Sequence, residues 1–529
     1  MSSLKPADIV IRHARIFTGD DANPFAEAVA VRGNRIVYVG SDAGVENFCG
    51  DQTRIMDGHN HTLTAGFIDT HVHLLSGATW MGYAELSQVH TKTELKAALL
   101  EYSQNNPSRE WIIGWRAHYE VISTRQELDE IIADKPVYIR SSDAHTAWAN
   151  TKALELAGIL NQGDTEGIIR DANGIATGEL REPDAMKAVL DIIPPPDDVF
   201  IREQLRKAVQ GFNRTGITSI HNMNGDMKDL MVYAAAEDAG ELNLRVYVPF
   251  EVKPEAVEAD LKEAVEMAKV QGEFVRGGAV KFFMDGVWES FTAFNVHPYA
   301  DDPNVVVKPL FSLEHFTRMA SACDKLGLQI AVHCCGDGAV RQTLDGYEAI
   351  QKQNGKRDSR HRIEHVEVCQ PEDMPRFKEL GVIASVQPTH APLRLDDGGV
   401  AKPRLGEPRW KFWQPWRDLK NAGALLSLGS DWTVVSYDPM THFHVALNRE
   451  KYTPDSTDQR LTLEECILGY TRDAAYVEFM EHEKGQVKEG YLADLVLFSH
   501  DLFELPPQDI LQAKAILTIV NGKIVHDND

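Results

Sequence analysis

Two histidines separated by one residue form the first pair in the chain that could do chemistry. His71 and His73 close the apolar segment GFIDTHVH, which begins at Gly66. On a strand, residues i and i+2 point to the same face, so the two imidazoles could hold one metal ion together. Two hydrogen-bonded structural histidines are the alternative, and this motif alone does not decide between them.

Further candidate ligands stand at the ends of three other apolar segments. His333 ends IAVH, His365 ends RIEH and Asp431 ends LGSD. Imidazoles together with a carboxylate suit a divalent ion such as zinc, which keeps one position open for water in catalytic sites. Each of these residues taken singly could be structural. Their recurrence at the ends of separate predicted strands favours a metal centre.

The elements that would position these residues alternate between buried strands and helices. Helical segments such as 313–326 separate apolar, β-branched runs, an alternation typical of a parallel sheet covered by helices. The runs begin near positions 66, 216, 244, 278, 328, 361, 381 and 424. Eight runs favour a closed (β/α)8 TIM-type barrel, whose chemistry takes place at the carboxyl ends of the strands.

The remaining segments predict two additions to the barrel. Residues 1–64 and 485–529 carry short alternating strands and turn signals, so we expect both chain ends to form one small β-sandwich domain. Residues 65–78 with 209–484 would then form the metal-dependent barrel. Residues 79–208, which hold helices and a strand-like run of their own, are expected to be an α/β insertion after the first barrel strand.

Composition narrows the class of protein. The 529 residues are 43% hydrophobic and 25% charged, which excludes a disordered or collagen-like chain. The net charge of −25 argues against nucleic-acid and anionic membrane partners. The sequence has neither a signal peptide nor a membrane-spanning apolar run, and its six cysteines form no disulfide framework. We therefore expect a cytoplasmic protein with a small-molecule substrate; a homodimer is common for such folds.

The motifs GFIDTHVH, AVHCCGD, RIEH and GSDW, in this order, resemble the amidohydrolase superfamily of metal-dependent hydrolases. The likeness is to its YtcJ-like branch, which includes N-substituted formamide deformylase, and it extends over nearly the whole chain. Segments 136–154, 174–178, 280–286 and 385–388 are also similar to that branch. The resemblance implies a (β/α)8 barrel beside a small β-sandwich, in agreement with the pattern of strands.

The resemblance also gives a role to Lys281, on the predicted fourth barrel strand. In superfamily members with a lysine there, the side chain reacts with carbon dioxide, or bicarbonate as its source, to form a carbamate that bridges two metal ions. Burial lowers the pKa of a lysine, and the neutral amine can then be carbamylated. A structural lysine paired with Asp285 is the alternative.

The implied reaction is metal-dependent hydrolysis of a carbon–nitrogen bond in an amide, N-formyl or N-acyl compound. A metal-activated hydroxide would attack the carbonyl, and Asp431 would serve as general acid and base. Ester or carbamate hydrolysis, deamination and decarboxylation on the same metal site remain alternatives, as does a non-catalytic scaffold. The predicted ligands of two divalent ions, with zinc preferred, are His71, His73, Lys281, His333, His365 and Asp431.

Other residues are candidates for supporting roles. Metal-bound histidines usually donate their second nitrogen to a carboxylate or carbonyl, although nearby carboxylates could instead cap helices or pair with arginines. The carboxylates in question are Asp285, Asp337 and Glu364. Candidate substrate-binding residues, each of which could simply pack, are Asp143, His145, Trp115, Trp288, Gln387 and His390.

Overall fold

The structure, a computed structural model, describes residues 5–122, 124–141, 146–162 and 166–528. The chain divides into two compact units. The first combines Met1–Leu74 with Val209–Asp529, and the second is Leu75–Ala208. The exact domain limits expected from the sequence stay a prediction.

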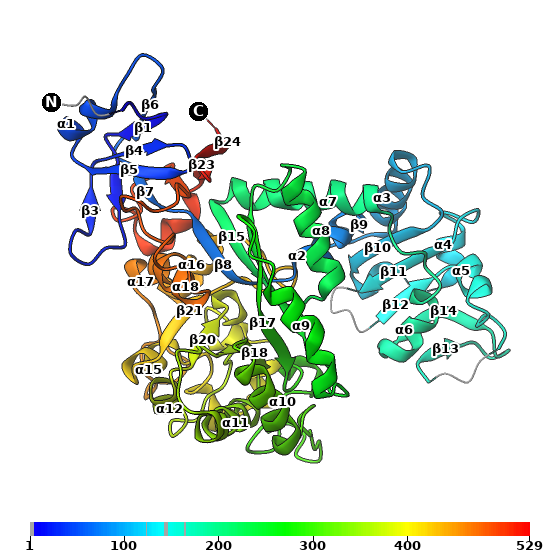
Figure 1. The fold of residues 1–529 in the computed structure, drawn as a ribbon. Helices are drawn as coiled ribbons and strands as arrows, with labels where there is room; N and C mark the ends of the chain where they lie inside the picture. The colour runs from blue at the N-terminus through cyan, green and yellow to red at the C-terminus, as the bar shows by residue number, and fades with distance from the viewer. Residues whose placement is uncertain (1–4, 123, 142–145, 163–165, 529) are drawn as a thin grey trace. The chain divides into compact units, whose positions relative to one another are not determined.

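A parallel sheet of eight strands forms the centre of the first unit (Figure 1). Neighbouring strands in the sheet follow one another in chain order, and an isolated parallel bridge between Val72 and Trp432 brings the last strand's end back to the first. The strands are β8 (Phe67–Val72), β15 (Ile217–Asn222), β16 (Arg245–Glu251), β17 (Val275–Phe283), β18 (Gln329–Cys334), β19 (Arg362–His365), β20 (Ile383–Val386) and β21 (Leu425–Leu428). The predicted (β/α)8 barrel is confirmed.

The barrel helices form where the sequence places an N-cap before a buried apolar face. In α10 (Leu313–Lys325) the side chain of Ser312 accepts a hydrogen bond from the backbone N–H of His315. Phe316, Met319 and Cys323 are buried on one face of this helix, at the spacing of an amphipathic helix.

The other helices of the first unit are α1 (Asp42–Val45), α8 (Met227–Asp238), α9 (Leu261–Ala268), α11 (Asp337–Asn354), α12 (Met374–Leu380), α13 (Ala401–Leu405), α14 (Glu407–Trp410), α15 (Trp416–Asn421), α16 (Pro439–Asn448), α17 (Leu463–Gly469) and α18 (Arg472–Val477). In the chain, α2 (Leu74–Met81) and α7 (Asp198–Arg214) cross the two limits of the second unit. Because helices cover the outside of the barrel and side chains fill its inside, every residue of β8, β15 and β18 is buried. Two 3-10 turns, η4 (Trp288–Ser290) and η5 (Pro388–His390), follow the fourth and seventh barrel strands.

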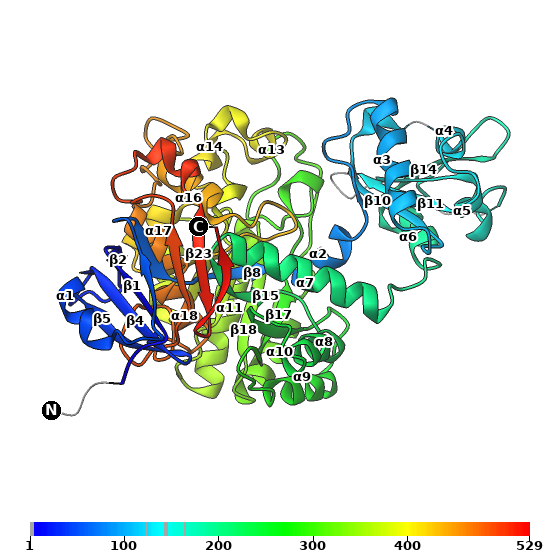
Figure 2. The same cartoon turned by 90° about the horizontal axis from the view of Figure 1, so that it is seen from above.

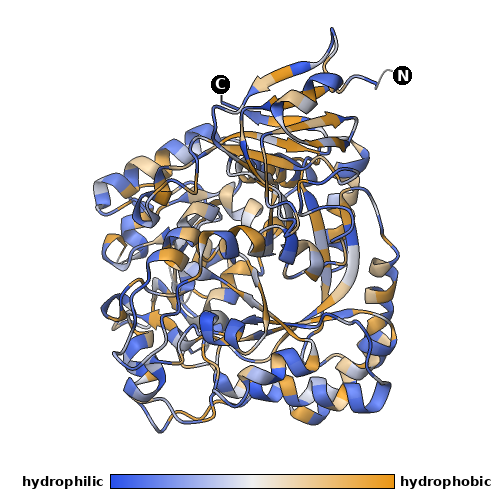
Figure 3. Ribbon diagram, turned by 90° about the vertical axis from the view of Figure 1, so that its left-hand side faces the viewer, coloured by the Kyte–Doolittle hydropathy of each residue, from blue (hydrophilic) through white to orange (hydrophobic). Residues whose placement is uncertain are grey.

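Both chain ends build two further sheets in the first unit. One sheet has the order β5 (Arg35–Gly40), β4 (Ala28–Arg32), β1 (Ile9–Arg12) and β6 (Arg54–Asp57). The other has the order β24 (Lys523–Asp527), β23 (Ala515–Val520), β22 (Leu495–Phe498), β7 (Thr62–Ala65), β2 (Arg15–Phe17) and β3 (Phe25–Ala26), so that strands from opposite ends of the chain pair. Ile11, Val29, Leu495 and Ile519 share the core of these sheets, whose strands are largely hydrophobic in Figure 3.

A buried ion pair between Arg245 and Asp494 connects the barrel to the sheet that contains strands from both chain ends. Nε of Arg245, at the start of β16, lies 2.7 Å from Oδ2 of Asp494, which precedes β22, and the two side chains are 6% and 4% exposed. The second guanidinium nitrogen lies 3.1 Å from Oδ1 of Asp494. Such a pair holds two distant segments together only while both charges are present.

We expect Asp494→Ala to lower the free energy of unfolding by about 3–5 kcal/mol, because the buried guanidinium of Arg245 loses its counter-charge. Urea denaturation measures the change. Asp458→Ala is the control, since the pair of Asp458 with Arg460 is about half exposed and its loss should cost at most about 1 kcal/mol. Equal losses in the two variants would contradict this role for Asp494.

The second unit, Leu75–Ala208, has its own sheet, and Figure 2 shows its helices. Among the described residues this sheet has the order β13 (Ile168–Arg170), β14 (Ala176–Arg181), β12 (Thr146–Ala149), β11 (Val137–Ser141), β10 (Ile112–Ala117) and β9 (Ala84–Glu85). The helices are α3 (Lys92–Asn105), α4 (Arg125–Asp129), α5 (Thr151–Leu156) and α6 (Glu182–Leu190). Since this unit lies between β8 and β15 in the chain, the expected α/β insertion after the first barrel strand is confirmed.

Candidate metal centre

The predicted ligands lie at the carboxyl ends of barrel strands. His71 lies within β8 and His73 directly follows it, while His333 and His365 stand at the ends of β18 and β19. Asp431 comes shortly after β21 and has a left-handed backbone with φ of 61°. The sheet order therefore brings residues that are hundreds of positions apart in the chain to one end of the barrel.

His71, His73 and Asp431 form one compact set of donor atoms. Oδ1 of Asp431 lies 3.1 Å from Nε2 of His73 and 3.5 Å from Nε2 of His71. Oδ1 of Asp431 and Nε2 of His71 are both buried and have no hydrogen-bond partner. Buried polar atoms without partners are costly, and a divalent cation between them would satisfy both. This set therefore fits a metal ion.

Hydrogen bonds fix the tautomers of the candidate histidines. Nδ1 of His71 lies 2.7 Å from a carboxylate oxygen of Glu364, and Nδ1 of His73 lies 2.7 Å from Oδ1 of Asn224. Nδ1 of His365 lies 2.8 Å from Oε1 of Gln387. Because each acceptor takes the proton of Nδ1, each Nε2 keeps a lone pair for a metal.

Burial keeps the imidazoles of His71, His333 and His365 neutral, because it lowers their pKa values. Burial and then the charge of Lys281 lower the pKa of His71 to about 3 and that of His333 to about 4. Burial alone would raise the pKa of Asp431, yet the surrounding histidines hold that pKa well below its ordinary value. Neutral imidazoles and an ionised carboxylate are the protonation states that metal binding requires.

Lys281 is buried at the end of β17 without a hydrogen-bond partner. Its side chain is fully buried, and Nζ lies 4.5 Å from the ring centroid of Phe283. Burial lowers the pKa of this amine. Asp285, its expected structural partner, instead accepts hydrogen bonds from the backbone N–H groups of Cys335 and Gly336 at 3.1 and 2.8 Å. Lys281 is thus a buried amine that does not pair with Asp285.

The ring of His333 packs against His365, and its Nε2 faces the backbone carbonyl of Gly286. The ring centroids of the two histidines are 4.4 Å apart. Nε2 of His333 lies 3.1 Å from the carbonyl oxygen of Gly286 and 3.7 Å from a carboxylate oxygen of Asp285. A proton on Nε2 donated to Gly286 leaves Nδ1 of His333 with its lone pair.

A second compact set of donor atoms includes a histidine that the sequence suggested only for substrate binding. His365, His390 and Asp431 each offer one ligand atom, and these atoms lie within 4.8 Å of one another. The rings of His365 and His390 are nearly parallel, at 6°, with centroids 5.8 Å apart. Asp431 therefore stands between two histidine groups.

Glu364 connects the first set to a buried arginine. Arg362 and Glu364 are both fully buried, and one guanidinium nitrogen of Arg362 lies 2.9 Å from Oε2 of Glu364. Arg362 also donates to the hydroxyl of Ser385 at 2.8 Å and to the carbonyl of Thr70 at 2.6 Å. These contacts hold the carboxylate that orients His71.

We expect Glu364→Gln to weaken metal binding about 10–100-fold, the usual effect of removing an orienting carboxylate. Competition with a chromogenic chelator measures the affinity. Asp324→Asn is the matched control, because Asp324 is also a buried carboxylate between an arginine and a histidine, 2.6 Å from Arg357 and 3.3 Å from His361. An equal loss of affinity in both variants would mean that the effect is general destabilisation.

The other sequence candidates occupy varied places. Asp337 accepts a hydrogen bond from the backbone N–H of Val296 at 2.8 Å and contacts Gln370, not a candidate ligand. Trp288 is buried and donates to the carbonyl of Cys335 at 3.2 Å. Trp115 is buried in the second unit, against Trp80. Asp143 and His145 lie outside the described residues.

Sequence reasoning missed three residues that act on the candidate ligands. Asn224 contacts His73, Arg362 holds Glu364, and Glu367 lies 3.4 Å from His390. Arg362 is the first residue of the RIEH motif and Glu367 follows the motif by two positions, so a charged residue near a predicted ligand was an available signal. Asn224 offered none, because an asparagine after a strand most often serves a turn.

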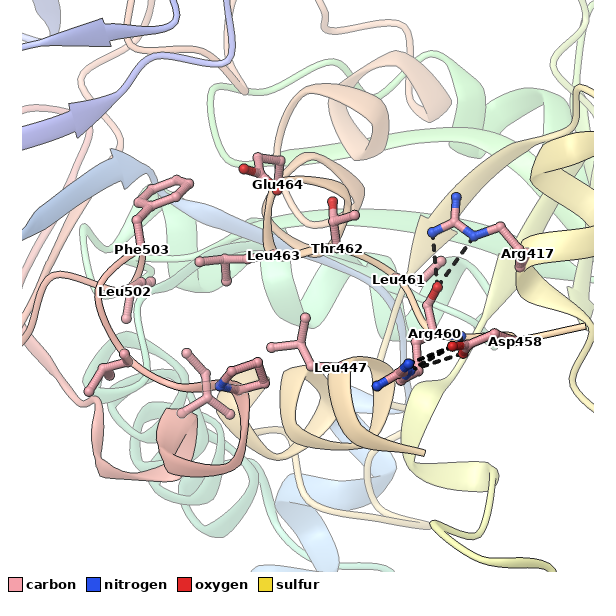
Figure 4. Close-up of a pocket in the computed structure, with 13 residues that line it drawn as sticks. Arg417, Leu447, Asp458, Arg460, Leu461, Thr462, Leu463, Glu464, Leu502 and Phe503 are labelled. Atoms are coloured by element: carbon pink, nitrogen blue, oxygen red, sulfur yellow. Dashed lines mark hydrogen bonds and ion pairs between the residues drawn. The ribbon is translucent and has the colours of Figure 1, made fainter. Parts of the chain in front are cut away.

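A separate surface pocket is lined by two arginines that already have partners (Figure 4). Its volume is about 630 Å³, and α16, α17 and the segment 502–510 contribute most of its lining. Arg417 donates to Glu465 at 2.6 Å, and Arg460 pairs with Asp458. The two guanidinium groups that line this pocket are therefore already neutralised within the chain.

Comparison with known proteins identifies the family. The amidohydrolase family model matches residues 54–526. The chain belongs to the amidohydrolase family. It is therefore a hydrolase that acts on carbon–nitrogen bonds, as expected from the motifs. In the described residues, no helix is both long and apolar enough to cross a membrane.

Relatives match this amidohydrolase along most of its length. Protein LONG AFTER FAR-RED 3 of Arabidopsis thaliana is 32% identical, over 98% of this chain and 91% of its own. Putative amidohydrolase YtcJ of Bacillus subtilis is 29% identical, over 97% and 98%. N-substituted formamide deformylase of Arthrobacter pascens is 26% identical, over 98% of both chains. The resemblance to the YtcJ-like branch is confirmed.

A solved structure shares the fold. An uncharacterized metal-dependent hydrolase from Pyrococcus furiosus matches with a TM-score of 0.77 and 24% identity, over 94% of this chain and 99% of that chain. This likeness supports the barrel with its additional domains.

Proposed function

We propose that this amidohydrolase cleaves the carbon–nitrogen bond of a small amide, N-formyl or N-acyl compound at a centre of two divalent ions. The observation that carries the proposal is Asp431, which stands between two groups of histidines and has a buried oxygen without a partner. A buried anion in this position needs a cation.

His71, His73 and Asp431 would hold the first ion, and His365 would hold the second, with His333 and Lys281 beside it. Ligand sets rich in imidazole favour zinc among the common divalent ions. When bound, a divalent ion supplies a nucleophile at neutral pH by lowering the pKa of water, and it polarises the carbonyl that is attacked.

Lys281 would supply a bridging anion. Its neutral amine adds to carbon dioxide and releases a proton, which gives a carbamate with two oxygens. The absence of a hydrogen-bond partner for Nζ and its burial support this reaction. An unmodified ammonium there would add a positive charge beside the cations.

Asp431 would carry the proton during the reaction. Its carboxylate takes the proton from the attacking water and delivers it to the nitrogen that leaves, which must be protonated before the bond breaks. Glu364, Asn224 and Gln387 keep the imidazoles in fixed orientations through the hydrogen bonds to Nδ1.

A product assay tests the proposal. The zinc-loaded protein is incubated with N-alkylformamides, N-acyl amines, the corresponding esters and heterocycles that carry a primary amino group, and amine, carboxylate, ammonia and alcohol are measured separately. Release of a carboxylate together with an amine is expected, since N-substituted formamide deformylase is similar over the whole chain. Release of only ammonia or only alcohol would instead indicate a deaminase or an esterase on the same site.

A further inference from the structure

His390 is oriented as a metal ligand by its surroundings. The 3-10 turn η5 carries it past the end of β20, where its side chain is 12% exposed. Oε1 of Glu367 lies 3.4 Å from Nδ1 of His390, so Nδ1 faces an acceptor. Nε2 of His390 is buried and has no hydrogen-bond partner, so with the proton on Nδ1 it would offer a lone pair to a cation.

The free nitrogen of His390 faces the second oxygen of Asp431. Nε2 of His390 lies 3.6 Å from Oδ2 of Asp431, whereas Oδ1 of the same carboxylate faces His71 and His73. Nδ1 of His365, which also faces Gln387, lies 3.9 Å from the same Oδ2. The two oxygens of Asp431 thus point at two separate histidine groups.

The geometry points to His390 as a ligand of the second divalent ion, together with His365, and to Glu367 as the residue that positions it. This inference rests on the proposed metal-dependent function but adds a ligand that the sequence did not suggest. Oδ1 of Asp431 would then bind the first ion, and Oδ2 would stay free to carry the proton.

Glu367 would act as Glu364 does on the opposite side. Each carboxylate lies beside Nδ1 of a candidate ligand, which keeps the imidazole in the tautomer with a free Nε2. The same arrangement therefore occurs twice: Glu364 faces Nδ1 of His71, and Glu367 faces Nδ1 of His390.

Metal stoichiometry tests the inference without relying on activity. Wild type, His390→Ala, Glu367→Gln and His442→Ala are dialysed against zinc and analysed for bound metal, and the affinities are measured by calorimetry. We expect about two ions in the wild type and about one in His390→Ala. Glu367→Gln should bind the second ion about 10–100-fold more weakly.

His442 is the matched control for packing in the same region. It is fully buried, Nδ1 lies 3.3 Å from the hydroxyl of Thr389, next to His390, and Nε2 lies 2.8 Å from the carbonyl of Ser436. Both nitrogens face partners within the chain, so His442→Ala should keep the wild-type metal content.

The outcomes separate this inference from the proposed function. Two ions bound with equal affinity in wild type and His390→Ala would overturn the role of His390 and leave a binuclear hydrolase. No bound metal in the wild type would overturn both. If His390→Ala does not fold, anomalous diffraction from zinc-loaded wild-type crystals tests the inference instead. A ligand nitrogen must lie about 2.0–2.1 Å from the ion. A second ion farther than this from Nε2 of His390 would contradict the inference.

Discussion

Asp431→Asn should lower kcat by about 10²–10⁴-fold, the contribution typical of a general acid and base. The amide cannot take up a proton from the attacking water or deliver one to the leaving nitrogen. Its remaining oxygen can still bind a cation, and the histidines around it are unchanged. At saturating zinc the variant should therefore keep most of its metal while losing turnover.

The measurement for Asp431→Asn is steady-state kinetics combined with metal analysis of the same sample. Asp285→Asn is a useful comparison, since Asp285 is also buried near the site but accepts hydrogen bonds from backbone N–H groups. Near-normal turnover in Asp431→Asn with full metal content would exclude this residue as the proton carrier. Loss of all metal would show that its charge mainly holds the ions.

Removal of the divalent ions should abolish turnover, and zinc should restore it. Without a cation, Nε2 of His71 and Oδ1 of Asp431 remain buried without partners. Binding should also stabilise the fold, by about 2.7 kcal/mol when free zinc exceeds the Kd 100-fold. Activity assays measure the first effect and thermal melts the second. Each is done before chelation, after chelation and after zinc is returned.

The double variant His71→Ala/His73→Ala controls for side effects of the chelator. It lacks two of the three donors in the first set, so chelator and zinc should shift its melting temperature less than that of the wild type. Full activity of the chelated wild type, verified as free of metal, would contradict metal-dependent hydrolysis.

The barrel and the positions of most candidate ligands follow from local sequence pattern. Buried parallel strands are continuous apolar runs, and ligands placed at the carboxyl end of each run must gather at one end of a barrel. His71, His333 and His365 were found in this way. The position of such a residue in the barrel can be predicted from its place at the end of a strand in the sequence.

Residues held by loops could not be placed in the same way. His390 lies beyond β20 in a 3-10 turn, and its neighbour Glu367 follows a different strand, so no periodicity relates them. Asp285 was only an alternative partner for Lys281. Its proximity to Lys281 in sequence suggested an ion pair, yet its carboxylate accepts backbone hydrogen bonds from the segment after β18.

Metal content tests the central claim most directly. The protein is purified without chelators in buffer containing bicarbonate, and wild type is compared with Lys281→Ala by elemental analysis. A binuclear centre with a carbamylated lysine predicts about two divalent ions per chain in the wild type and fewer in the variant. No divalent ion in the wild type, even after reconstitution with zinc and bicarbonate, would contradict it.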